Sequence, residues 1–148
     1  MSMLKFKKVF PEAIIPSKAH EPDAGWDLFV LPSFRRVTLG PGELVRAPTG
    51  IAFVFPKGKF GLIHSRSSST TNGLMVEGIV DNGYTGQIYL QIRNVGQEEI
   101  EISGGKSYGQ MILMDYSPDY STLEEVFDVP ATARGTKGFG ASGNGHGC

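Results

Sequence analysis

Residues 35–63, RRVTLGPGELVRAPTGIAFVFPKGKFGLI, decide the fold class. Four short apolar or alternating runs follow one another here. The turn signal Gly40-Pro41-Gly42 separates the first run from the second, and Pro56-Lys57-Gly58 separates the third from the fourth. Val, Ile and Phe recur in the runs, as strands favour. Short strands at regular spacing with turns between them predict an antiparallel sandwich or barrel. The four runs are 35–39, 44–47, 51–55 and 60–63.

The same pattern extends to both sides of this stretch. Further runs with strand composition are predicted at 4–9, 26–31, 86–92, 100–102, 111–114 and 123–129. Helix signals are scarce, since the only candidate helical turn follows Arg66 and continues to Asn72. Its composition is typical of helix caps and it has no apolar stripe, so the helix should be short. The sequence predicts an all-β domain with at most one short helix.

No linker divides the chain, so residues 1–133 are expected to form one domain. Residues 134–148, RGTKGFGASGNGHGC, differ because six of them are Gly and only Phe139 is strongly apolar. Such a segment cannot bury enough surface to fold alone. It is either a disordered terminus or a lid that orders over a ligand, and composition by itself favours the terminus.

Composition excludes several classes of protein. The 148 residues have a formal net charge of −1, which provides no basic surface for stable binding to nucleic acid or anionic membranes. The single cysteine, Cys148, cannot form an internal disulfide, and a cysteine-rich zinc site is excluded. No stretch has the apolar core of a signal peptide or the length to span a bilayer, so we expect a cytoplasmic protein.

The segment 78–88, GIVDNGYTGQI, is the strongest candidate for chemistry. An apolar run ends in Asp81, turns through Asn82-Gly83 and resumes as a strand, and Asn-Gly is a strong hairpin signal. A plain hairpin with Asp81 in a turn position is favoured without more context. The functional interpretation places one carboxylate and the Tyr84 ring at the hairpin mouth, where exposed backbone can hydrogen-bond a planar ligand edge.

Two further segments carry charged side chains. Ser65–Ser69 follows a predicted strand and precedes the helical turn, so Arg66 and backbone N–H groups could bind phosphate, although a solvated capping loop is common. In Asp23–Leu28 two carboxylates bracket a turn into a strand. Metal binding or pairing with Arg66 is open there, and a turn-forming Asp is favoured in isolation.

The order and spacing of these segments together resemble the five motifs of the trimeric dUTPase family. The segments that carry the resemblance are 23–28 (DAGWDL), 65–68 (SRSS), 78–86 (GIVDNGYTG), 104–112 (GGKSYGQMI) and 134–143 (RGTKGFGASG). The last is the most specific, because the family ends in Arg-Gly-x-x-Gly-Phe-Gly-Ser-Thr-Gly. The resemblance extends from about His20 to Gly143.

The resemblance implies a jelly-roll-like or β-clip fold and a homotrimer with swapped C-terminal tails and three shared active sites. It implies hydrolysis of dUTP to dUMP and pyrophosphate with Mg²⁺ as cofactor. The metal would be held by the triphosphate and water, with no direct protein ligand and with Asp27 near its water or near Arg66. Three different subunits would contribute to each site. One would provide motifs one, two and four, another motif three, and another motif five.

Residue roles follow from the same resemblance. Asp81 would be the general base that orients water for attack on the α-phosphorus. The residues expected at uracil and deoxyribose are Ile79, Val80, Asn82, Tyr84 and Phe139, of which Tyr84 would exclude a 2′-OH and Phe139 would stack on uracil. The residues expected at the phosphates are Arg66, Ser67, Ser68, Gln110, Arg134, Gly140 and Ser142.

Two alternative functions are open on the same fold, and one residue argues against each of them. In dCTP deaminases, which share the fold and several motifs, a Glu on the strand after the hairpin moves protons at the pyrimidine C4. Gln91 stands at the matching place and cannot act as an acid or base, which favours the hydrolase. A non-catalytic nucleotide-binding regulatory module is excluded less well, and the carboxylate of Asp81 argues against it. A regulatory protein partner stays open.

Overall fold

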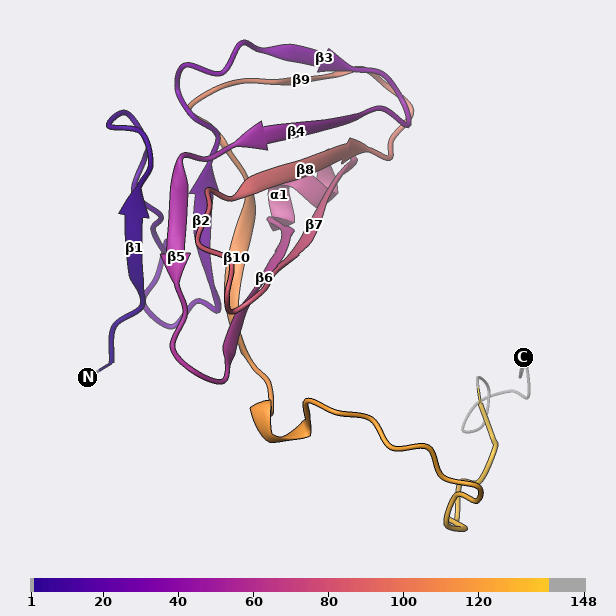
Figure 1. Cartoon of the computed structure of the whole chain (residues 1–148). Coiled ribbons are helices and arrows are strands. Elements are labelled where there is room, and N and C mark those ends of the chain that lie inside the picture. Colours follow the sequence, from indigo (N-terminus) through magenta and orange to yellow (C-terminus); the bar gives the residue numbers. More distant parts are fainter. Residues whose placement is uncertain (1, 139–148) are drawn as a thin grey trace. The chain divides into compact units, whose positions relative to one another are not determined.

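Ten short strands and one five-residue helix form the ordered framework of residues 2–138, the part of the chain that the computed structural model describes (Figure 1). The strands are β1 (Lys5–Lys8), β2 (Gly25–Phe29), β3 (Val37–Leu39), β4 (Leu44–Pro48), β5 (Ile51–Val54), β6 (Lys59–Ser65), β7 (Leu74–Val80), β8 (Tyr89–Asn94), β9 (Ile100–Ile102) and β10 (Ser107–Asp115). The helix α1 (Ser67–Thr71) follows β6, and a 3-10 turn, Pro118–Tyr120, follows β10. The predicted all-β class and single short helix are confirmed.

The strands pair only in antiparallel fashion among these residues. The largest sheet has the order β2-β10-β6-β7-β8-β4, and two smaller sheets pair β1 with β5 and β3 with β9. In Figure 1 the large sheet is strongly curled, as twisted antiparallel sheets are in jelly-roll-like folds. Strands β10 and β6 therefore lie in the interior of the sheet and position the residues at their ends.

One face of the large sheet forms the core. Strand β8 alternates exposed and buried residues along its whole length, as a half-buried strand requires. Core side chains from five strands, each 2% exposed or less, are Leu28, Ile63, Val76, Leu90, Ile92 and Met111. Burial of each contributes about 1.5–3 kcal/mol, so this face anchors the sheet.

Two buried polar side chains hold connections against this core. Asn94 is fully buried, donates to Leu39 O at 2.9 Å and Glu98 O at 2.7 Å, and accepts the N–H of Gly96 at 2.9 Å. Thr49, also fully buried, donates to Ile88 O at 2.7 Å. Because the polar atoms of both side chains are hydrogen-bonded, they hold in place the loops that they contact.

The predicted strand at 123–129 is wrong. This segment forms no strand, and Leu123, Phe127 and Val129 are exposed. A strand needs a partner to bond its backbone, and no described residue pairs with this one. Among the described residues, those numbered 119–138 form a unit distinct from the β body that ends at Pro118. The expected domain boundary at residue 133 stays a prediction.

The predicted Asn-Gly hairpin is also wrong in its geometry. Strand β8 begins at Tyr89, not at Gly86, so residues 81–88 form a longer connection between β7 and β8. A two-residue hairpin of this kind needs positive φ at both turn residues, and neither Asn82 nor Gly83 has it. The Asn82 side chain instead donates to Pro56 O at 2.9 Å and Lys59 O at 2.8 Å, which ties the turn to the neighbouring β5–β6 loop.

Across residues 2–138, no helix combines the length and the apolar character that crossing a membrane requires.

Candidate functional site

The residues of motifs one, two and four meet at one end of the large sheet. Strand β10 lies between β2 and β6, and Gln110 pairs in register with Asp27 on one side and His64 on the other. Arg66 follows the end of β6 and caps α1. Because all three strands reach this end, side chains far apart in the sequence come into direct contact.

Arg66 is held by two partners at this end. Its Nε lies 3.2 Å from Asp27 Oδ1, and its Nη1 donates to Ser107 O at 3.2 Å. The Arg66 side chain is 36% exposed and that of Asp27 is 21% exposed. The guanidinium is thus oriented by the protein while it remains accessible to an anionic ligand.

Gln110 is oriented by a neighbouring glycine. Its Nε2 donates to Ser65 O at 3.1 Å. A Cβ built on Gly25 would lie 2.2 Å from Gln110 Oε1, so Gly25 provides the room that this amide occupies. Gly25 is not among the site residues predicted from the sequence, because no local signal shows that the facing strand carries a large polar side chain.

The serines around Arg66 divide into two kinds. Ser69 is buried and donates to Tyr108 O at 2.7 Å, and Ser65 is buried and accepts the N–H of Val76 at 2.7 Å. The Ser69 hydroxyl attaches α1 to β10, and the Ser65 hydroxyl adds a bond between β6 and β7. Ser67 and Ser68, which the sequence predicts at the phosphates, are exposed on the first turn of α1 beside Arg66.

The residues of motif three gather at a second place. Ile79, Val80, Asp81 and Tyr84 line an open hollow of about 290 Å³. The hollow is also lined by Gln91, which the sequence predicts at the place of the deaminase Glu. The structure therefore brings the predicted base, the predicted uracil-reading backbone and this amide side chain together.

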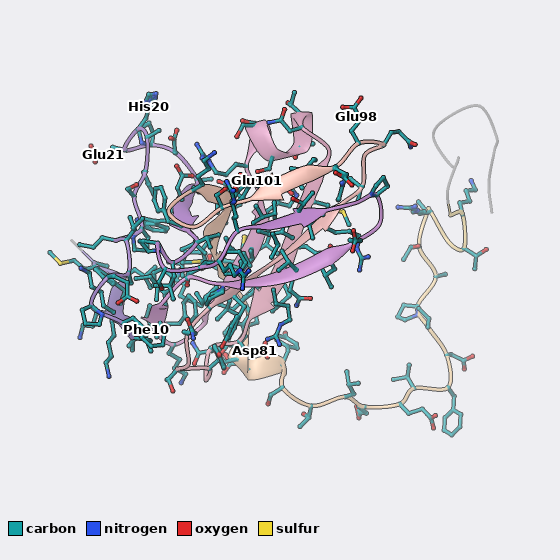
Figure 2. The ribbon with its side chains drawn as sticks, turned by 90° about the horizontal axis from the view of Figure 1, so that it is seen from above. Phe10, His20, Glu21, Asp81, Glu98 and Glu101 are labelled. Atoms are coloured by element: carbon teal, nitrogen blue, oxygen red, sulfur yellow. The ribbon has the colours of Figure 1, made fainter. Side chains whose placement is uncertain are left out.

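Asp81 has an accessible carboxylate at the mouth of this hollow. It is exposed, and among residues 2–138 its side chain has no hydrogen-bond or ion-pair partner. In the view of Figure 2 the labelled Asp81 lies at the lower edge of the strand body. Its backbone is fixed, since its carbonyl accepts the N–H of Tyr84 at 3.0 Å. A carboxylate of this kind is free to bind a water molecule.

One chain does not bring these two places together. In the β6–β7 pair Val80 lies opposite Gly61 and Glu77 lies opposite His64, so Asp81 and Arg66 follow opposite ends of the pair. Arg66 is five positions beyond Gly61, which corresponds to roughly 16 Å along an extended strand. A single nucleotide α-phosphorus cannot lie beside both residues of the same chain.

The segment with motif five is described only as far as residue 138. Arg134 closes a small turn, in which its Nε donates to Lys137 O at 2.8 Å and its carbonyl accepts the N–H of Lys137 at 3.3 Å. Gly135 sits inside this turn with φ at +59°, a value that favours glycine. Phe139, Gly140 and Ser142, which the sequence predicts at uracil and phosphate, lie outside the described residues.

Comparison with known proteins identifies the class to which this fold and these motifs belong. The dUTPase family model matches residues 11–143. A deoxyuridine 5′-triphosphate nucleotidohydrolase of Clostridium novyi is 37% identical over 145 residues, which is 95% of this chain and 98% of that protein. One of Mycolicibacterium gilvum is 39% identical and covers 90% of each chain. The chain belongs to the dUTPase family.

Solved structures agree with this assignment. The Staphylococcus bacteriophage 80alpha dUTPase with dUPNHPP has a TM-score of 0.80 and 28% sequence identity, over 97% of this chain and all of that one. A point mutant of the same phage enzyme has a TM-score of 0.81 with 27% identity, over 95% of this chain and 98% of that one. The jelly-roll-like fold that the resemblance implied is therefore confirmed.

Proposed function

We propose that this chain hydrolyses dUTP at the α-phosphorus to give dUMP and pyrophosphate. Family membership over residues 11–143 supports the reaction class. The observation that carries the proposal is the hollow in which an unpaired carboxylate, Asp81, lies beside the Tyr84 ring and the backbone of Ile79 and Val80.

Asp81 acts as the general base in this proposal. Its carboxylate accepts a proton from a bound water, and the water oxygen forms a bond to the α-phosphorus while the bond to the bridging oxygen breaks. Pyrophosphate leaves with the electron pair of that bond. The exposed and unpaired state of Asp81 supports this role, because no neighbouring cation of the described chain competes for the carboxylate.

The base and sugar are recognised by the connection from β7 to β8. The Asn82 side chain is bonded to Pro56 O and Lys59 O, so Asn82 contributes through its backbone together with Ile79 and Val80. Tyr84 packs under the deoxyribose and leaves no room for a 2′-OH. Phe139, from motif five, stacks on the uracil ring.

The triphosphate is held by the other end of the sheet. Arg66 offers a guanidinium that Asp27 and Ser107 orient, and Gln110 offers an amide that Gly25 leaves in place. The exposed hydroxyls of Ser67 and Ser68 add donors beside Arg66. Further contacts with the phosphates come from motif five, through Arg134, Gly140 and Ser142.

The active site is shared between copies of the chain in a homotrimer with swapped C-terminal tails. The roughly 16 Å along β6 between Arg66 and Gly61, which pairs with the residue before Asp81, support this, because a second copy can supply the missing carboxylate. Each site then combines Arg66 of one copy with Asp81 of another.

The outer face of the large sheet supports such an assembly. Leu62 pairs in register with both Ile79 and Ile112, and Phe60 pairs with Met114, so these five apolar residues form a continuous outward-facing patch. Ile79 is 59% exposed and Met114 is 37% exposed. A contiguous apolar patch of this kind on a β sheet is typical of a protein interface.

Mg²⁺ is the proposed cofactor, bound to the triphosphate. Among residues 2–138, no three His, Cys, Asp or Glu side chains come close enough to hold a metal ion. The charged groups of the site suit a metal that arrives with the nucleotide, with Asp27 near its water or Arg66. When bound, Mg²⁺ neutralises phosphate charge and favours the departure of pyrophosphate.

We propose that this reaction takes place in the cytoplasm.

A regulatory role beside catalysis has one supporting observation. The solved structures of the phage 80alpha enzyme are described as those of dUTPases that control transfer of virulence genes by a G-protein-like mechanism. A chain of this fold can thus join nucleotide hydrolysis to regulation. A module that binds nucleotide without turnover is the separate alternative, and an assay of pyrophosphate release distinguishes it from the hydrolase.

The test is pyrophosphate release from dUTP, dCTP, dTTP and UTP with Mg²⁺, in wild type and Asp81→Asn. We expect release from dUTP alone and its loss in the variant. Ammonia release from dCTP, measured in parallel, would mean that Gln91 does not separate the hydrolase from the deaminase. Tight dUTP binding without turnover of any nucleotide would instead support a regulatory module.

A further inference from the structure

The connection that carries Tyr84 is held by its backbone at both ends. The N–H of Tyr84 donates to Asp81 O at 3.0 Å, which closes a turn directly after β7. At the far end, Ile88 donates its N–H to Ile51 O at 2.8 Å and accepts the N–H of Thr49 at 3.0 Å. The connection is thus attached to the β4–β5 turn, and what remains to be fixed is the ring of Tyr84.

The Tyr84 ring lies folded back over Gly86. Its hydroxyl donates to Gln87 O at 2.7 Å. A Cβ built on Gly86 would lie 2.5 Å from the Tyr84 hydroxyl oxygen and 2.7 Å from its Cζ. The φ of Gly86 is outside the left-handed region, so space and not backbone conformation demands glycine here. Any side chain at position 86 would push the ring away.

The Gln87 side chain fixes the carbonyl that receives the Tyr84 hydroxyl. Its Oε1 accepts the N–H of Gly50 at 3.0 Å, and its Nε2 donates to the Tyr89 hydroxyl at 3.2 Å. The Tyr89 ring in turn lies under the Arg46 guanidinium, 4.7 Å from the ring centroid. Gln87 therefore connects the acceptor of the Tyr84 hydroxyl to the β4–β5 turn and to the start of β8.

We propose that Gly86 and Gln87 are positioning residues that fix the Tyr84 ring, and that the fixed position of the ring excludes ribonucleotides from the site. The inference rests on the proposed function, in which Tyr84 lies under the sugar. Tyr84 is 45% exposed, so packing by its own chain does not immobilise it. A loose ring can move aside for a 2′-OH, whereas a ring bonded at its hydroxyl cannot do so without losing that bond.

The test compares kcat/KM for dUTP with kcat/KM for UTP in wild type, Gln87→Met and Gly86→Ala. Methionine keeps the length of the side chain and removes both hydrogen bonds, while alanine displaces the ring directly. We expect the preference for dUTP over UTP to fall by about tenfold in each variant, the size of effect that loss of a hydrogen bond produces. The change comes mainly from faster turnover of UTP.

Two controls separate positioning from damage to the fold. Gln87→Glu keeps an acceptor for Gly50 and one for the Tyr89 hydroxyl, so it should restore the preference, and its charge acts on both triphosphates alike. Gly83→Ala adds a Cβ that meets nothing within 4 Å, and it should keep the wild-type preference. Unfolding midpoints establish that each variant is folded.

The outcomes distinguish this inference from the proposed function. A wild-type preference for dUTP that persists in Gln87→Met and Gly86→Ala overturns the inference alone. Equal losses of activity with dUTP and UTP also overturn it, because they show a purely structural role. If one of the two variants does not fold, the other decides together with Gln87→Glu. A wild-type protein that hydrolyses neither nucleotide overturns the proposed function and this inference with it.

Discussion

The two parts of the site are built by different means. At the phosphate end, Gln110 extends from β10 and Arg66 follows the end of β6, and hydrogen bonds and an ion pair orient both side chains. At the uracil end, residues 81–88 form no strand, and hydrogen bonds to neighbouring loops fix their position. The charged groups thus take their places from the sheet, whereas the groups that select the nucleotide depend on loop anchors.

The largest expected effect tests the uracil end. Asp81→Asn keeps the size of the side chain and removes its ability to take a proton, so kcat for dUTP should fall by about 10²–10⁴-fold. The melting temperature should not change, because Asp81 is exposed and has no bonded partner among the described residues. Pyrophosphate release and a thermal melt measure both. The matched control is Glu98→Gln, an exposed carboxyl outside the site, and a comparable loss there would remove the special role of Asp81.

The next effect tests the phosphate end. Gly25→Ala adds a Cβ at 2.2 Å from Gln110 Oε1, so the amide must move and the strands must shift slightly. We expect kcat/KM for dUTP to fall by about 10–100-fold, the cost of moving a binding group out of alignment. Gly83→Ala is the control with free space around the added methyl group. Wild-type kinetics in Gly25→Ala would show that Gln110 does not contact the nucleotide.

The sequence predicted the phosphate end better than the uracil end for a physical reason. Strand alternation and turn residues are local, so nine of the ten strands and α1 overlap runs predicted from short patterns, whereas β7 was predicted only as the apolar run that ends in Asp81. Gly25 meets Gln110, and the Gln87 amide meets Gly50, only because the sheet register or a distant loop brings them near. No short window of sequence contains both members of either pair.

The wrong strand predictions have the same origin. Residues 123–129 have strand composition, but a strand exists only where a second one bonds it. Asn82-Gly83 has the sequence of a tight hairpin, but the Asn82 amide donates hydrogen bonds to Pro56 O and Lys59 O, outside the turn. In both cases tertiary partners decided what local propensity left undetermined.

A smaller effect asks whether charge or geometry matters at the phosphate end. Arg66→Lys keeps the positive charge and loses the fork that contacts Asp27 and Ser107 O together. We expect KM for dUTP to rise by about tenfold, because one oriented, charge-assisted hydrogen bond is lost. Arg93→Lys provides a control. Arg93 is an exposed arginine on another strand, β8, and its side chain donates to Gly42 O. An unchanged KM in Arg66→Lys would mean that charge alone suffices.

The smallest effect returns to the anchors of the uracil end. Thr49→Val has nearly the same shape and removes a hydroxyl that donates to Ile88 O at 2.7 Å and accepts the N–H of Ile51 at 3.2 Å. Ile88 O keeps the N–H of Thr49, so the connection stays attached, and the loss of unfolding free energy should be about 1–2 kcal/mol. Urea unfolding at one fixed protein concentration measures it, with Thr38→Val, an exposed strand threonine, as control.

The ratio of dUTP to UTP turnover in Thr49→Val then shows whether nucleotide selection depends on the Tyr84 ring or on the connection around it. Thr49 fixes the backbone at Ile88, whereas Gln87 fixes the carbonyl that receives the Tyr84 hydroxyl. If nucleotide selection depends on the ring and not on general rigidity, Thr49→Val should lose stability and keep its preference for dUTP. A loss of preference as large as that in Gln87→Met would show that the whole connection, and no single bond within it, selects the sugar.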